Sequence, residues 1–146
     1  MKRMCVILIL LLNFVLSAND LIMIENMINS NRVTETPDIA KNLSARGSIH
    51  QSKGEYKEAI QLYETSLMLR ERIGLEKSYG YATVLFLLAI AKDKLGDSCN
   101  ALNHAKKSIS VYYYLGKDED ARVLENEIQI YNTNCNLKNK IIVINN

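Results

Sequence analysis

Apolar side chains recur every three or four residues over most of the chain beyond residue 36, which is the spacing of an amphipathic α-helix. Thr36-Pro37, just before this pattern, is typical of a helix start. Glycines interrupt the pattern at Gly54, Gly74, Gly96 and Gly116. The pattern predicts an all-α protein with helices at residues 37–53, 56–72, 78–95, 98–115 and 118–134.

The helical pattern repeats after 42 residues. Residues 40–74 align with residues 82–116. The matched pairs include Gly54 with Gly96, Ala59 with Ala101, Ser66 with Ser108 and Gly74 with Gly116. A fixed period of this length indicates a solenoid, in which antiparallel helix hairpins stack and each unit buries its apolar face against its neighbours. We therefore expect two full units followed by one helix that caps the stack.

Three local features fit such a stack. Gly47 is unfavourable inside a helix and indicates a close crossing by the next helix, which we place at Ala59. Residues 84–91 are an unbroken apolar run, so their helix should be covered on all sides. The helix at 118–134 has one apolar side and a polar opposite side, as a solubilising cap requires. Its apolar side consists of Ala121, Leu124, Ile128 and Tyr131.

The two ends of the chain differ from this middle part. Residues 1–18 combine a basic start, an apolar run of 12 residues and the small residues Ser17-Ala18, which is typical of a cleaved signal peptide. A membrane-spanning helix needs about 20 residues, so we expect no membrane anchor after cleavage. Residues 19–36 should form an N-terminal capping segment, amphipathic over 20–31. The helical domain should cover 37–135, and residues 136–146 should form a C-terminal tail that is packed, a short strand or disordered.

The charge of the chain argues against two classes of partner. The formal net charge is +2, and loss of residues 1–18 removes Lys2 and Arg3 and no acid, which leaves 0. A neutral surface has no electrostatic footprint for nucleic acid and no polybasic membrane patch. We therefore expect a periplasmic or secreted protein that binds neither nucleic acid nor a membrane surface.

Two cysteines, Cys99 and Cys135, remain after cleavage. An even number in an exported protein favours a disulfide. Cys99 begins one predicted helix and Cys135 ends the next, and antiparallel helices bring such ends within reach of a bridge. We predict a Cys99–Cys135 disulfide, the alternative being two buried free thiols. Neither histidine has metal-ligand spacing to these cysteines, so we expect no metal site.

The repeated residues resemble the tetratricopeptide repeat. The first unit carries the family's small and aromatic positions at Leu43, Gly47, Gly54, Tyr56, Ala59 and Tyr63. The second carries a looser version at Leu85, Ala89, Gly96, Ala101 and Ser108, with Ala105 where an aromatic is common. The period exceeds the usual length of about 34 residues and is similar to that of the kinesin light chain subclass. Gly74 and Gly116 stand where a proline often closes the unit. The resemblance covers about residues 40–135.

This resemblance implies a right-handed superhelix whose first helices line a concave groove. The implied groove residues are Ser44, Ser48 and Gln51 in the first unit, Phe86, Ile90 and Asp93 in the second, and Ile128 and Asn132 in the third. The groove lacks the lysines and asparagines with which one well-known version grips a carboxylate, so carboxylate capture is not implied. Phe86 and Ile90 either anchor a partner helix or extended peptide, or are covered by residues 20–31.

The sequence gives no support for catalysis. The pattern places no acid or nucleophile beside His50 or His104, and it contains no phosphate loop, metal motif or nucleophile elbow. The rings of Tyr112-Tyr113-Tyr114 point in three directions on a helix, so at least one should be buried. We therefore expect no enzyme, no cofactor, and no catalytic, cofactor-binding or metal-binding residues.

Three functions remain open. The first is an exported protein–protein interaction module that serves as an accessory or scaffold subunit of an envelope complex. The second is a periplasmic immunity or inhibitor protein that neutralises an exported toxin. The third is a small enzyme or solute binder, which would need a deep pocket with convergent polar groups.

Overall fold

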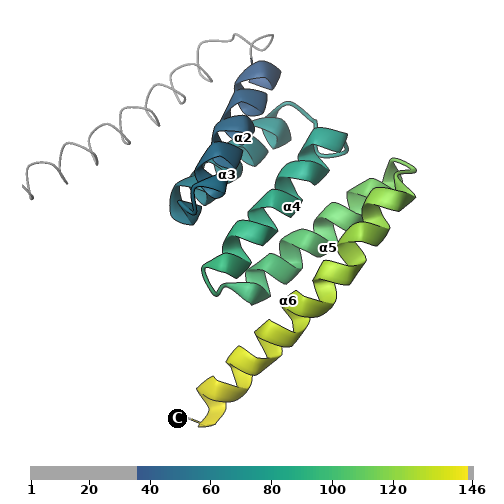
Figure 1. Ribbon diagram of the computed structural model, residues 1–146. Coiled ribbons are helices and arrows are strands. Elements are labelled where there is room, and N and C mark those ends of the chain that lie inside the picture. The colour runs from purple at the N-terminus through teal and green to yellow at the C-terminus, as the bar shows by residue number, and fades with distance from the viewer. Residues whose placement is uncertain (1–35, 145–146) are drawn as a thin grey trace, which may run out of the picture. The chain divides into compact units, whose positions relative to one another are not determined.

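The structure is a computed structural model that describes residues 36–144 (Figure 1). The predicted signal peptide and nearly all of the predicted capping segment lie outside these residues. The described residues form the helices α2 (Thr36–Ser52), α3 (Tyr56–Arg72), α4 (Tyr79–Lys94), α5 (Ser98–Tyr114) and α6 (Asp118–Ile144). The first four begin and end within one residue of the predicted bounds. The prediction of an all-α stack of helix hairpins is confirmed.

Glycines end the helices at the same points of both units. Gly54 after α2 has φ +78° and Gly96 after α4 has φ +77°, a left-handed conformation that favours glycine. The N–H of Gly54 donates to the carbonyl three residues before it at 3.0 Å, and Gly96 makes the same bond at 2.8 Å. The 42-residue repeat is therefore a repeat of backbone geometry as well as of residue type.

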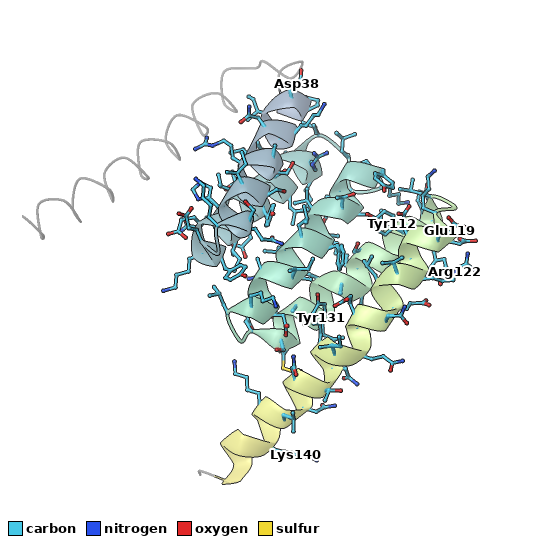
Figure 2. The ribbon with its side chains drawn as sticks, in the orientation of Figure 1. Asp38, Tyr112, Glu119, Arg122, Tyr131 and Lys140 are labelled. Carbon is cyan, nitrogen blue, oxygen red and sulfur yellow. A yellow bond between two sulfur atoms is a disulfide. The ribbon has the colours of Figure 1, made fainter. Side chains whose placement is uncertain are left out.

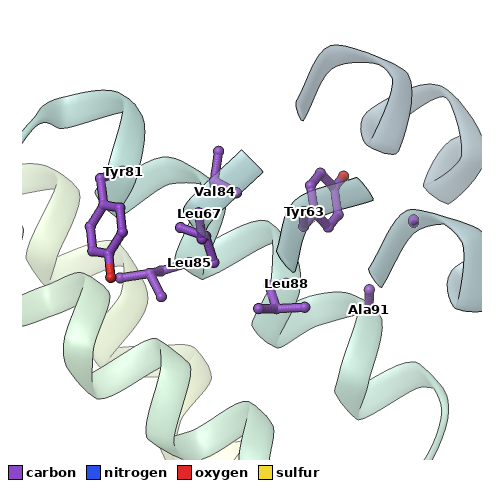
Figure 3. Packing of buried hydrophobic residues seen from close by; sticks show 8 residues of the cluster. Tyr63, Leu67, Tyr81, Val84, Leu85, Leu88 and Ala91 are labelled. Carbon is purple, nitrogen blue, oxygen red and sulfur yellow. The ribbon is translucent and has the colours of Figure 1, made fainter. Parts of the chain in front are cut away.

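The largest buried cluster joins the two units across α3 and α4 (Figure 3). Tyr63 and Leu67 of α3 pack against Tyr81 and Leu88 of α4. Three of these four side chains have no exposed surface, and Leu67 is nearly as buried. The apolar run 84–91 thus supplies the covered middle helix that the sequence predicted.

A buried serine ties the second helix of each unit to the first. Ser66 Oγ on α3 donates to the carbonyl of Ala40 on α2 at 2.6 Å, and Ser108 Oγ on α5 donates to the carbonyl of Ala82 on α4 at 2.8 Å. Both serines are fully buried. A small hydroxyl lets the helices approach closely and satisfies its own hydrogen bond against the backbone.

Gly47 marks a close helix crossing, but its neighbour is Tyr63 and not the predicted Ala59. A Cβ atom at Gly47 would lie 2.6 Å from Cε1 of the Tyr63 ring. The corresponding pair in the second unit is Ala89 and Ala105, and the ring that packs there is Tyr131 of α6. An aromatic ring therefore fills both junctions, but it comes from a different helix in each.

The last helix differs from the prediction in length and in register. It was expected to end at 134 and continues to Ile144, so that residues 136–144 of the predicted tail are helical. The residues of α4 that pack with α3 are Tyr81, Val84, Leu88 and Ala91, and those of α6 that pack with α5 are Ala121, Leu124, Ile128 and Tyr131. The offset between the two sets is 40 residues and not 42. The connection is shorter before α6 (residues 115–117) than before α4 (residues 73–78), which accounts for the shift.

The predicted disulfide joins Cys99 of α5 to Cys135 of α6, with their Cα atoms 4.8 Å apart. Cys135 lies inside α6 and not at its end, so residues 136–144 continue past the bridge (Figure 1). Lys138 Nζ also donates to the carbonyl of Gly96 in the α4–α5 turn, at 2.9 Å. The cap helix is therefore fastened covalently and by a hydrogen bond at the level where α5 begins.

Candidate functional site

The three predicted groove residues of α2 lie along one side of the helix, and two of them hold Tyr63. The Tyr63 hydroxyl donates to Gln51 Oε1 at 3.0 Å and lies 3.3 Å from Ser48 Oγ. Burial raises the pKa of this phenol, so it stays a hydrogen-bond donor. Ser44 is half-buried, and its hydroxyl donates to the carbonyl of Lys41 at 2.9 Å. Ser48 and Gln51 thus serve the packing of α2 on α3 from the predicted groove face.

Phe86 is held partly by the cap of the stack. The side chain is half-buried and packs against the cluster of Ala82, Tyr112, Ala121 and Leu124, which brings together α4, α5 and α6. Sequence reasoning had weighed a partner or residues 20–31 as the cover for Phe86, and α6 supplies part of that cover. Residues 20–31 lie outside the described part of the chain.

Ile90 and Asp93 lie further along α4 and are both half-buried. The Asp93 carboxylate accepts hydrogen bonds at the same oxygen from Ser98 Oγ at 2.6 Å and from Asn134 Nδ2 at 3.3 Å. It therefore joins α4 to the start of α5 and to α6. Ile90 belongs to none of the buried apolar clusters of the described residues, which makes it the most available apolar side chain among the predicted groove residues.

The two predicted groove residues of α6 are affected by the 40-residue offset. Ile128 is half-buried and packs with Ala89 of α4 and the start of α5, whereas Asn132 is exposed. The residue that follows Ile90 by 40 is Ile130, which is 52% exposed. The sequence pattern assumed a constant period, so it assigned the groove position to the residues on either side of Ile130.

The three consecutive tyrosines behave as helical geometry requires. Tyr112 is buried and its hydroxyl lies 3.0 Å from Thr83 Oγ1, whereas Tyr113 and Tyr114 are exposed. Tyr113 donates to Glu125 Oε1 of α6 at 2.7 Å. The prediction of one buried ring and no common aromatic platform is confirmed.

Two charged clusters escaped the sequence analysis. His50 Nδ1 lies 2.6 Å from Glu55 Oε2 across the α2–α3 turn, so an acid does stand beside this histidine. A second cluster joins three helices, because Tyr81 donates to Glu71 while Lys107 Nζ donates to the Tyr81 hydroxyl at 2.5 Å. The bond from Tyr81 lowers the pKa of Glu71, and the Tyr81 bond likewise raises the pKa of Lys107. Local spacing gives no signal for a cluster that draws one residue from each helix.

His104 is half-buried beside the ion pair of Lys92 and Glu64, whose charged atoms are 2.9 Å apart. Burial, aided by the positive charge of Lys92, lowers the pKa of His104. A histidine whose pKa is lower in the folded chain stabilises the fold at pH values above its unfolded pKa of about 6.5, and this stabilisation is lost as the pH falls. The environment fits a neutral structural imidazole.

The described residues contain no group of three or more side chains placed to hold a metal ion. No helix in residues 36–144 is both long enough and apolar enough to cross a membrane. The chemistry available on the predicted groove face therefore consists of half-exposed apolar side chains and hydrogen-bonding groups, which suits recognition of a polypeptide.

Comparison with known proteins gives one result on the family. A family model described as the tetratricopeptide repeat matches residues 38–113, which is just over half of the chain and spans α2 to α5. None of the curated proteins compared with the chain matches it.

Proposed function

Because the chain belongs to the tetratricopeptide repeat family, whose repeats are protein–protein interaction modules, we propose that it is an exported module that binds a partner helix or extended peptide. The binding face is the side of α2 and α4 that carries Gln51 and Ile90, and the protein serves as an accessory or scaffold subunit of an envelope complex. A groove built by stacked first helices suits extended or helical peptides.

The observation that carries this proposal is the state of Ile90. It is a half-exposed apolar side chain on a helix whose other faces are taken up by α3, α5 and α6. Hydrogen-bonding groups flank it on the same predicted face. An apolar anchor with polar neighbours is the usual composition of a peptide-recognition surface.

Export is supported by two features of the chain. Residues 1–18 have the order of a signal peptide, with a basic start, an apolar run and small residues. The Cys99–Cys135 disulfide suits an oxidising compartment such as the periplasm or the extracellular space.

The partner test is affinity capture of the full chain, carrying a C-terminal tag, from envelope and secreted fractions of the source organism. Ile90→Asp should lose the partner, because a carboxylate on the apolar anchor would have to be desolvated. Met68→Asp is the matched control, since Met68 is an exposed apolar residue on α3. Thermal melting of both variants shows that each is folded.

The identity of a captured protein decides between the two readings of this module. A resident envelope protein supports the scaffold role, and an exported toxin supports an immunity or inhibitor protein. Capture that is equal in wild type and Ile90→Asp overturns the assignment of the binding face. The intact mass of the recovered protein tests export, because a chain that still carries residues 1–18 in the cytoplasmic fraction contradicts it.

A further inference from the structure

The cap helix α6 carries a line of exposed apolar side chains, Val123, Ile130 and Leu137, which we call the α6 stripe. They are 61%, 52% and 54% exposed. Their spacing of seven residues is two helical turns, so all three lie along one side of the helix. Single exposed apolar residues are ordinary on a protein surface, but three in a line on one helix indicate an interaction surface.

The stacking of the repeats does not account for this stripe. Ala82 and Ala89 of α4 pack against α5, the second helix of their own unit. With the offset of 40 residues, their counterparts on α6 are Arg122 and Gln129, which are exposed. The face on which a further helix of the stack would pack is therefore polar, and the α6 stripe lies beside it.

Charge is distributed unevenly along the same helix. The first half of α6, up to Ile130, contains five acids and one base. These residues are Asp118, Glu119, Asp120, Glu125 and Glu127, with Arg122 as the base. The second half, up to Ile144, contains Lys138 and Lys140 and no acid. Figure 2 shows Glu119 and Arg122 near one end of α6 and Lys140 near the other.

This asymmetry is complementary to itself when two copies of α6 lie antiparallel. The acidic half of one helix then lies along the basic half of the other, and parallel pairing would instead place the acidic halves together. The stripe is symmetric about Ile130, with seven residues to Val123 on one side and seven to Leu137 on the other. A two-fold axis at Ile130 therefore places Val123 of each copy opposite Leu137 of its partner, as an isologous interface requires.

The fold also makes α6 a rigid and accessible element. The helix has 27 residues and is about 40 Å long. The disulfide at Cys135 and the bond from Lys138 fix its middle part to the stack, and the helix continues past both. Two copies can therefore approach along α6 without rearrangement, which lowers the entropic cost of association.

We infer that the α6 stripe is the interface of an antiparallel homodimer, in which two copies of the chain pair through α6 about a two-fold axis at Ile130. The occupant of the stripe is a second copy of this chain, because its apolar spacing and its charge asymmetry both fit α6 itself. This assembly is independent of partner binding at Ile90, since the two surfaces are defined by different residues.

Sedimentation velocity of the purified tagged protein over a series of concentrations tests the dimer. Wild type should show the dimer mass, and the dimer should dissociate at lower protein concentration in low salt than in high salt, because salt screens the paired charges. Ile130→Asp should lose the dimer, and Met68→Asp should keep it. A wild-type monomer at every concentration, or an Ile130→Asp protein that stays dimeric, overturns the proposal.

Single cysteines test the geometry. Ile130→Cys should form a covalent dimer on mild oxidation, because the two copies of residue 130 meet at the axis. Val123→Cys alone should not, since its two copies would be about 21 Å apart along the helices, but it should cross-link to Leu137→Cys when the two variants are mixed. Lys57→Cys on exposed α3 gives the background. Equal cross-linking of Val123→Cys and Ile130→Cys overturns the antiparallel arrangement.

Discussion

At the scale of single residues, the repeat preserves contacts more closely than it preserves residue types. Ser66 and Ser108 make the same buried bond in both units, whereas Tyr63 is replaced by Ala105 and its ring by that of Tyr131. A single sequence shows which positions are small or aromatic. It does not show which helix supplies the ring, and this is why Gly47 was assigned the neighbour Ala59 when Tyr63 occupies the crossing.

We expect Ser66→Ala and Ser108→Ala to lower the free energy of unfolding by similar amounts, about 1 kcal/mol each. Each change removes one buried hydrogen bond and leaves the helix packing intact. Ser110→Ala on the exposed side of α5 is the matched control and should change stability by less than about 0.5 kcal/mol. Urea unfolding followed by circular dichroism measures all three. Equal effects of Ser108→Ala and Ser110→Ala would show that the buried bond contributes nothing.

At the scale of helices, the pattern of apolar residues was sufficient for α2 to α5 and insufficient for α6. Four helices followed from apolar periodicity and from glycines that take a positive φ. The end of α6 was missed because the polar residues around Cys135 looked like a helix end, although the disulfide and Lys138 hold that segment against the stack. The short connection before α6 also shifts its register, so the groove assignment of Ile128 and Asn132 could not be obtained from a constant period.

Loss of the disulfide should loosen α6 before it affects the rest of the stack. The bridge closes a loop with a sequence separation of 36 residues, and such a constraint is worth about 3–4 kcal/mol through the unfolded chain. Cys135→Ser should therefore lower the melting temperature under oxidising conditions. Hydrogen exchange should rise more in α6 than in α3. A wild-type melting temperature that is unchanged by added reductant would contradict this expectation.

At the scale of the whole molecule, stability depends on the junctions between neighbouring helices. The described helices have no central core that all of them share, because the buried residues form clusters between successive layers. In a solenoid the coupling between neighbouring units decides whether the chain unfolds in one step or in parts. The α3–α4 cluster is the junction between the two repeat units, so it should control cooperativity.

Leu88→Ala tests this coupling, because Leu88 is fully buried in the α3–α4 cluster. The substitution leaves a cavity and should cost about 3 kcal/mol. Its effect should extend to both units, so that hydrogen exchange rises in α2 as well as in α5. Leu95→Ala is the matched control, since Leu95 is 45% exposed at the end of α4, and it should change stability by less than about 0.5 kcal/mol. If only α4 gains exchange in Leu88→Ala, the two units are independent and the junction does not couple them.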